Sequence, residues 1–281
     1  MPERPDLAYA VPILSRALSG SEIASTALHK PPVLRLAVPG SLDEALVGAT
    51  IVGLHRRLHF VCVELGPTSA VELIIAPMLA GSLSVHLPKE GQRRDRALTL
   101  GLRDGRELRY RDAVQMGKVY VIPRGQHQLI PGFEEVGIDV LDPEAFTLEA
   151  FTALARKRRD QVKVFLLDKS ALDSLGNAYA DEVLFAAGIH PKTFVRKLDA
   201  AELERLHRAI PTVLREASEE IARRKPATDE KVRDFLKVRN RHKEPCPVCG
   251  TAIRKAGVRG FDAFFCPRCQ PETRKSGIVS W

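Results

Sequence analysis

Four of the five cysteines form two identical C-x-x-C pairs near the end of the chain. Two such pairs, separated by a loop of this length, can offer four thiolates to one tetrahedral Zn²⁺. Two disulfides in a secreted protein are the alternative. They fit less well, because the N-terminus lacks a secretory pattern and the rest of the chain holds only Cys62. The spacing therefore predicts one structural zinc ion bound by Cys246, Cys249, Cys266 and Cys269.

A zinc ion with four cysteine ligands has no open coordination position. Such an ion folds a small module and does not activate a substrate or water. Catalytic groups must therefore be sought elsewhere in the chain.

The charge of the chain favours a polyanionic partner. The net charge is +8 at pH 7, and basic clusters occur at residues 156–159, 223–225 and 237–243. A membrane partner is disfavoured, because no apolar run approaches the roughly 20 residues of a membrane span and no basic amphipathic helix carries bulky apolar anchors. The composition predicts a cytoplasmic, nucleoid-associated protein that binds nucleic acid.

The first 130 residues have the pattern of a β-domain that begins with a helix. Leu7, Val11, Leu14 and Leu18 follow helical spacing. Short β-branched and apolar runs then alternate with turns rich in Gly, Pro and Asp, which is typical of a β-sandwich. The expected strands are 60–65, 71–75, 97–102, 107–110 and 118–122.

Helical periodicity replaces the strand pattern in the second half of the chain. We expect helices at 147–158, capped by Thr147, and at 160–167, 182–187 and 200–222, with a loop at 175–179. The fold class is therefore α+β and multidomain. The predicted order is a β-sandwich domain at 1–130, a linker at 131–146, a helical domain at 147–235 and a Cys₄ zinc-finger β-hairpin at 236–281.

Three segments carry a resemblance to one known family. The chain opens MPERPD, residues 167–191 read LDKSALDSLGNAYADEVLFAAGIHP, and the cysteine pairs lie in EPCPVCGT and FCPRCQ. In this order they resemble the formamidopyrimidine-DNA glycosylase and endonuclease VIII family, with its MPELPE opening, its GNIYADEVLF-AGIHP helix–two-turn–helix core and its finger. The resemblance implies a monomeric base-excision repair enzyme that flips and excises a damaged base in double-stranded DNA or acts on an abasic site.

The resemblance makes Pro2 the nucleophile and Glu3 its proton-handling partner. Removal of Met1 would expose a secondary amine at Pro2, and an α-amino group has a pKa of about 7.7–8, so a useful fraction is neutral near pH 7. Attack of this amine on C1′ of the sugar gives an iminium, which releases the base and permits β-elimination of phosphate. Glu3 is placed to protonate the ring oxygen of the sugar.

Asn177 aligns with the family asparagine that grips a phosphate beside the lesion. A side-chain amide and loop N–H groups suit that task, because they position a strand without reading its sequence. A plain turn asparagine after Gly176 is the alternative.

Two family cations are replaced in this chain. His59 stands at the position of a lysine in the β-domain, and a mostly neutral imidazole is a weaker phosphate clamp, although it could act as an acid or base or simply pack in the sheet. Phe261 stands at the arginine position of the finger tip, and Arg259 two residues earlier is the candidate substitute.

Apolar wedge residues also differ from the family pattern. Leu79, or Met78 after a slip of one residue, aligns with the methionine that fills the space left by a flipped nucleotide. Gln115 and Met116 replace an arginine and a phenylalanine, and core packing is the alternative role. These departures leave open a catalytically weakened or inactive protein that binds damaged DNA. A zinc-ribbon factor for RNA is a third reading, which would make the family matches coincidental.

Overall fold

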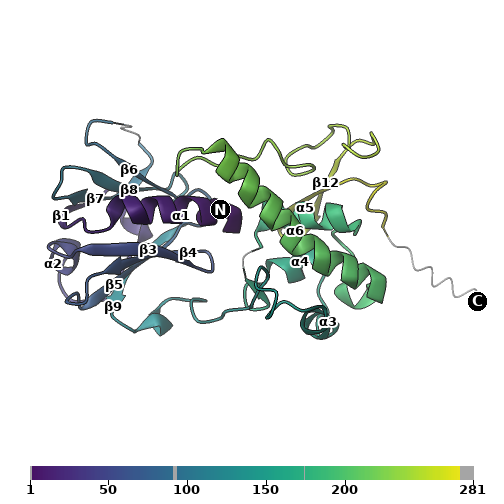
Figure 1. Ribbon diagram of the computed structural model, residues 1–281, viewed down its shortest axis with the longest axis horizontal. Helices are drawn as coiled ribbons and strands as arrows, with labels where there is room; N and C mark the ends of the chain where they lie inside the picture. Colours follow the sequence, from purple (N-terminus) through teal and green to yellow (C-terminus); the bar gives the residue numbers. More distant parts are fainter. Residues whose placement is uncertain (1, 91–93, 174, 273–281) are drawn as a thin grey trace, which may run out of the picture. The chain divides into compact units, whose positions relative to one another are not determined.

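The computed structural model describes residues 2–90, 94–173 and 175–272 of the 281-residue chain. The chain divides into two compact units. The N-terminal unit comprises Met1–Glu135 and Ala217–Val232, and the C-terminal unit comprises Val136–Glu216 and Arg233–Trp281. Each unit is described by itself below (Figure 1).

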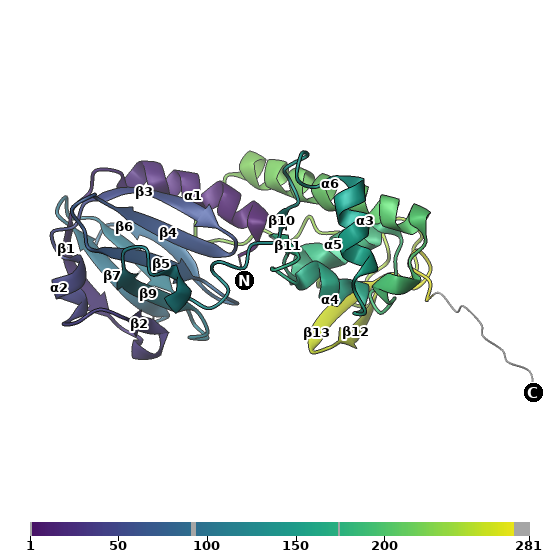
Figure 2. The same ribbon diagram turned by 90° about the horizontal axis from the view of Figure 1, so that it is seen from below.

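The N-terminal unit begins with helix α1 (Arg4–Leu18), which packs against strand β3 (Figure 2). Pro5 suits the first turn because its missing N–H has no partner to lose there. The Asp6 carboxylate accepts a hydrogen bond from the Glu3 backbone N–H at 2.7 Å, which fixes the helix start. The four apolar side chains at helical spacing are all buried, so the predicted amphipathic helix is confirmed.

Two sheets follow α1, and their facing apolar side chains form one core, as expected for a β-sandwich. One sheet is entirely antiparallel, with strand order β1-β7-β8-β6. Its strands are β1 (Ile23–Leu28), β6 (Ser82–His86), β7 (Arg96–Leu102) and β8 (Glu107–Arg111).

The second sheet has the order β2-β9-β5-β4-β3. Only its edge pair, β2 with β9, is parallel. The short helices α2 (Leu42–Leu46), η1 (Pro31–Val33) and η2 (His127–Leu129) lie in connections of this unit. The strands are β2 (Leu34–Leu36), β3 (Ile51–Arg57), β4 (Phe60–Leu65), β5 (Val71–Ala76) and β9 (Lys118–Pro123).

All five predicted strands are present, and their ends agree with the structure to within one residue. The sequence missed β1, β2, β3 and β6. Strand β3 ends in His55, Arg56 and Arg57, so its polar end hides the strand pattern, although Ile51 and Leu54 are buried.

The C-terminal unit is mainly helical. Thr147 caps α3 by accepting the Ala150 backbone N–H at 3.1 Å, as predicted. The expected loop at 175–179 is wrong in its second half, because α5 begins at Asn177 after Gly176 in an extended conformation. Alanine and tyrosine continue the helix there without a break. The elements are β10 (Ile138–Asp139), α3 (Leu148–Arg156), α4 (Val162–Leu167), β11 (Leu172–Asp173), α5 (Asn177–Ala187), η3 (Val195–Lys197), α6 (Ala200–Arg224), β12 (Arg254–Val258) and β13 (Phe261–Phe265).

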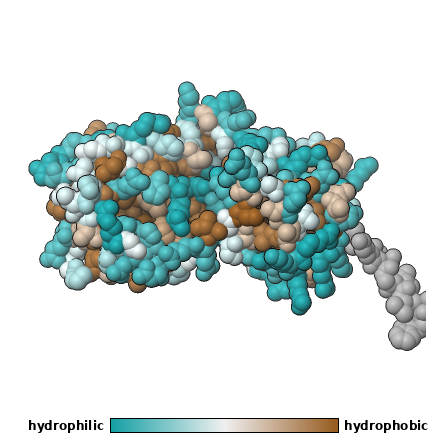
Figure 3. Space-filling view, turned by 60° about the horizontal axis from the view of Figure 1, so that its bottom comes forward, coloured by the Kyte–Doolittle hydropathy of each residue, from teal (hydrophilic) through white to brown (hydrophobic). Residues whose placement is uncertain are grey.

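The face of the protein drawn in Figure 3 is mostly polar. Hydrophilic side chains cover most of the face drawn in Figure 3, with smaller apolar groups between them. Within the described residues, none of the helices combines the length and apolar character that a bilayer span requires.

Candidate active site and metal centre

The four cysteines of the C-terminal unit form one cluster. Their sulfur atoms all lie within 4.8 Å of one another. The Sγ–Sγ distances are 3.8 Å for Cys246–Cys269 and 3.4 Å for Cys249–Cys266, far longer than the roughly 2.05 Å of a disulfide. Zn–S bonds of about 2.3 Å in a tetrahedron place sulfur atoms about 3.8 Å apart. The predicted ligand set therefore fits one structural zinc ion.

Backbone N–H groups in the two C-x-x-C loops orient these thiols. Val248 N–H donates to Cys246 Sγ, and Cys269 N–H donates to Cys266 Sγ, both at 3.4 Å. Hydrogen bonding from Thr251 lowers the pKa of the Cys249 thiol to about 6. Burial raises the pKa of the Cys266 and Cys269 thiols, so zinc, which binds thiolates, must displace their protons.

The hairpin β12–β13 carries the predicted DNA-binding residue at its tip. Val258 pairs with Phe261, so Arg259 and Gly260 form a two-residue turn. Both have positive φ, 46° and 86°, as a type I′ turn requires. Arg259 is exposed at the tip, while Phe261 is the first residue of β13 and 41% exposed. The guanidinium thus has the tip position even though Phe261 replaces the family arginine.

A buried ionic cluster holds the hairpin close to its tip, because Asp262 follows directly after the first pair of the turn. The Asp262 backbone carbonyl accepts hydrogen bonds from Lys163 Nζ at 2.7 Å and from Arg239 at 3.1 Å. The Asp181 carboxylate pairs with both cations. Burial raises the pKa of Asp181, while Lys163 and Arg239 act in the opposite direction. No sequence pattern indicates this cluster, because three charged residues far apart in the chain are expected on the surface.

The neighbouring Glu182 fixes the segment that leads from α6 to the zinc module. Its carboxylate accepts the backbone N–H groups of Lys237, Val238 and Arg239 at 2.7–2.9 Å. Burial raises the pKa of Glu182, and the three N–H donors lower it. Asp181 on α5 therefore positions the hairpin, and Glu182 positions the segment 237–239 that precedes it.

Asn177 is the first residue of α5 and is half-buried. Its side-chain Oδ1 is buried and accepts no hydrogen bond from the described part of the chain. The start of an 11-residue helix also concentrates unpaired N–H groups and positive dipole. This location suits an anion such as phosphate.

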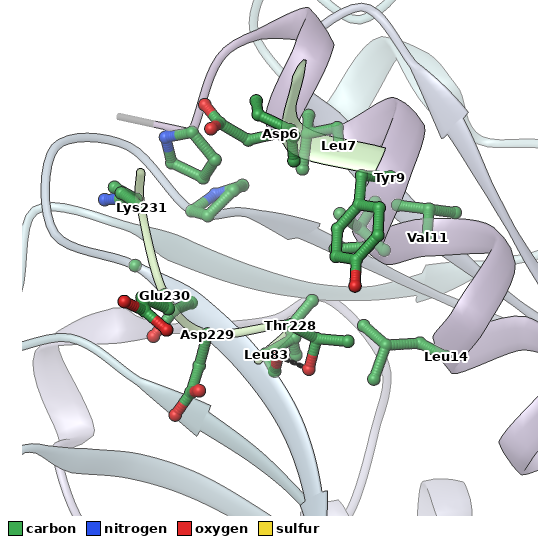
Figure 4. A pocket seen from close by; sticks show the side chains of 17 residues that line it. Asp6, Leu7, Tyr9, Val11, Leu14, Leu83, Thr228, Asp229, Glu230 and Lys231 are labelled. Carbon is green, nitrogen blue, oxygen red and sulfur yellow. Dashed lines mark hydrogen bonds between the residues drawn. The ribbon is translucent and has the colours of Figure 1, made fainter. Parts of the chain in front are cut away.

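The N-terminal unit places Pro2 in a narrow pocket of about 30 Å³ (Figure 4). Pro2 is buried, and Glu3 beside it is only 6% exposed. Helix α1 contributes Asp6 and Tyr9, and residues 228–231 form another wall. The sequence did not indicate that this polar segment after α6 would lie next to Pro2.

Four contacts hold the segment 226–231 on the β-sandwich. Tyr9 donates to the Pro226 carbonyl and Thr228 to the Leu83 carbonyl, both at 2.9 Å. The last two contacts are an ion pair of 2.7 Å between Arg111 and Asp229 and a hydrogen bond of 3.1 Å from Lys231 Nζ to the Leu79 carbonyl.

His59 lies in the turn between β3 and β4, not in a strand as its alignment suggested. Leu58 before it has φ 53° and is 3% exposed, so a buried leucine occupies a conformation that normally favours glycine. The imidazole lies against the Phe60 ring, with centroids 4.1 Å apart and the ring planes tilted by 34°. The backbone of this turn is strained at Leu58, directly before His59. Strain of this kind is often found at functional positions.

Two loops of this unit present apolar side chains to solvent. Leu79 is 56% exposed and Met116 is 45% exposed, whereas Met78 is half-buried against the core. Leu79 is therefore the better candidate for the wedge. Val114, which the sequence did not single out, is 55% exposed.

The buried Asp112 carboxylate organises the second of these loops. It accepts the backbone N–H groups of Val114, Gln115 and Gly117 at 2.7–3.1 Å. Gln115 is half-buried with φ 58°. Without Asp112, these amides would lose their shared acceptor.

Comparison with known proteins gives matches in the same order as these elements. The formamidopyrimidine-DNA glycosylase N-terminal domain matches residues 1–119, and its H2TH domain matches residues 136–225. A zinc finger found in FPG and IleRS matches residues 243–271.

Full-length relatives agree with these domain matches. The chain is 34% identical to a formamidopyrimidine-DNA glycosylase of Symbiobacterium thermophilum, over 96% of this chain and 90% of the relative. It is 31% identical to one of Pelotomaculum thermopropionicum, over 96% and 99%. The Lactococcus lactis Fpg bound to abasic-site DNA superposes with a TM-score of 0.83 at 25% identity, covering 96% of this chain and all of that one. A mutant of the same protein bound to Fapy-dG DNA gives 0.85 at 27% identity, with the same coverage.

Proposed function

This chain belongs to the formamidopyrimidine-DNA glycosylase family, and from that membership we propose that it is a base-excision repair DNA glycosylase with abasic-site lyase activity. Its proposed substrate is double-stranded DNA that contains a damaged base or an abasic site. The observation that carries the proposal is the position of Pro2 in a pocket next to the buried Glu3. One chain holds all the proposed groups, so we infer a monomer that acts on nucleoid DNA in the cytoplasm.

The proposed chemistry begins with the Pro2 amine after removal of Met1. The nitrogen lone pair attacks C1′, the bond from C1′ to the base breaks, and the base leaves with the bonding electrons. The N–H proton of Pro2 passes to the departing base, which restores the lone pair on nitrogen. Glu3 donates a proton to the ring oxygen O4′, the C1′–O4′ bond breaks, and an iminium forms between Pro2 and C1′. Loss of a C2′ proton then expels the 3′ phosphate by β-elimination. Hydrolysis of the iminium returns the free amine.

Two residues of the C-terminal unit are proposed to hold the DNA backbone. Arg259 is exposed at the hairpin tip, where an always-charged guanidinium can pair with a phosphate. Asn177 at the start of α5 can donate its amide N–H groups to a phosphate. The zinc ion supports this grip because it fixes the fold of the finger.

The N-terminal unit supplies the proposed wedge. Exposed Leu79 and Met116 can fill the space vacated by a flipped nucleotide and offset part of the unstacking cost of a few kcal/mol. Gln115, which precedes Met116 in the chain, is proposed to contact the unpaired base. His59 is proposed as a proton donor or acceptor near the sugar-phosphate, because an imidazole ring can both donate and accept a proton.

A lesion panel of labelled duplexes tests this function. We expect release of at least one oxidised or ring-opened base, followed by strand cleavage. Glu3→Gln should abolish base release, whereas Glu134→Gln, at an exposed position of the same unit, should leave it unchanged. Binding of every lesion without release of any base would instead support a damage-binding protein that has lost turnover.

A further inference from the structure

The segment after α6 places one cation in the pocket of Pro2. The described pocket lining consists of 17 residues, and Lys231 is the only one among them with a basic side chain. We propose that Lys231 is a substrate-contacting residue that binds the phosphate beside the lesion, in place of the lysine that His59 replaces. This inference rests on the proposed glycosylase function.

Three carboxylates also line the pocket, and Glu230, the one next to Lys231 in the chain, is exposed to solvent. Asp229 pairs with Arg111 at 2.7 Å, and the Asp6 carboxylate accepts the Glu3 backbone N–H. Most of the remaining lining is apolar, including Leu7, Val11 and Leu14. A single ammonium in such surroundings attracts an anion more strongly than it would in open water.

A hydrogen bond and an anchored backbone hold the Lys231 ammonium group in place. Lys231 Nζ donates to the Leu79 carbonyl at 3.1 Å, in the loop whose exposed Leu79 side chain is the proposed wedge. The contacts of Pro226, Thr228 and Asp229 fix the preceding backbone. Figure 4 shows Lys231 and Asp6 at one end of the pocket and Leu14 at the other. Lys231 therefore connects the nucleophile pocket with the wedge loop.

A cation in this region would assist the proposed reaction. β-Elimination expels a phosphate group, whose charge must be stabilised as the C3′–O bond breaks. His59 stands at the family's lysine position and Phe261 at the family's arginine position, so neither family cation is present at its own place. Lys231 supplies an ammonium group on a segment that is anchored next to Pro2.

The salt dependence of DNA binding measures this contact directly. Binding to a duplex with a tetrahedrofuran abasic analogue is compared for the wild type, Lys231→Met, Lys231→Arg and Lys89→Met, with thermal unfolding as the check on folding. Each phosphate contact contributes about 0.9 to the slope of log K against log salt concentration. Lys231→Met should reduce that slope by about 0.9, while Lys89→Met, at an exposed site of the same unit, should not change it. Lys231→Gln replaces Lys231→Met if the latter fails to fold.

Single-turnover cleavage of abasic duplex gives the second readout. Lys231→Met should slow strand cleavage by about tenfold or more, and Lys231→Arg should recover most of the rate. An unchanged salt slope in Lys231→Met, or no recovery in Lys231→Arg, would overturn the role of Lys231. If the wild type forms no adduct with abasic DNA, the proposed chemistry fails, and the salt slope alone still decides whether Lys231 binds phosphate.

Discussion

Lys163 and Asp181 form an ion pair in which neither side chain is exposed to solvent. The same carboxylate binds Arg239 at 2.8 Å, and both cations donate to the Asp262 carbonyl of the finger hairpin. This buried ionic cluster fixes the orientation of the hairpin that carries Arg259 within the C-terminal unit. It also makes the C-terminal unit sensitive to the loss of a single charge.

Asp181→Asn should destabilise the C-terminal unit by about 3–5 kcal/mol, because Lys163 would remain buried without its counter-charge. Urea unfolding followed by far-UV circular dichroism measures the change. Glu244→Gln is the matched control, because Glu244 belongs to an exposed pair with Arg241 that contributes less than about 1 kcal/mol. Equal stability of the two variants would show that the cluster does not support the fold.

His190 should make the stability of the C-terminal unit depend on pH. Burial lowers its pKa below the ordinary value, and its Nδ1 accepts the Lys192 backbone N–H at 3.2 Å. The unfolded chain therefore binds the proton more readily than the folded chain. Stability is fully present above the unfolded pKa of about 6.5 and is lost as the pH falls toward the folded pKa.

Urea unfolding of the wild type and His190→Asn across this pH range tests that prediction. Asparagine keeps an acceptor for the Lys192 N–H but does not titrate, so the variant should lose less stability on acidification. The same loss in both proteins would assign the pH dependence to other groups.

Asp112→Ala should disorder the loop that presents Gln115 and Met116. Three backbone N–H groups lose their shared acceptor, at a cost of about 1–3 kcal/mol or more. Thermal unfolding and binding to abasic-analogue DNA should both weaken. Asp112→Asn keeps an acceptor oxygen and should be intermediate, whereas Asp104→Ala, in the exposed turn before β8, should have little effect on binding. If Asp112→Ala binds abasic DNA as tightly as the wild type, the loop is not part of the interface.

Cys249→Ala should remove zinc and DNA binding together, because three remaining thiolates cannot complete the closed site. Metal analysis should fall from one zinc per chain toward zero. Cys62→Ala is the control, because Cys62 is buried in the N-terminal unit and burial raises the pKa of its thiol to about 12. Full zinc content in Cys249→Ala would contradict the four-cysteine site.

The features that sequence predicted are those with a strong local signal. Cysteine spacing identified the zinc ligands. The run from Phe60 to Leu65 was predicted as a strand because it is almost entirely apolar, and in the structure all but one of its side chains are buried. Long-range placement left no such signal. Lys231 lies in a polar segment without periodicity, and only folding brings it to the pocket of Pro2. Lys163 and Asp181 are charged residues whose burial depends on a partner distant in sequence.

Borohydride trapping on abasic-site duplex tests the central claim most directly, because reduction of an iminium leaves a permanent bond between protein and DNA. We predict a covalent adduct with the wild type and with Pro88→Gly, at an exposed position of the same unit. Pro2→Gly should give much less adduct, because a primary amine replaces the secondary amine and the pyrrolidine ring that fills the pocket is lost. An adduct of undiminished yield in Pro2→Gly, or no adduct with the wild type, would contradict catalysis by Pro2.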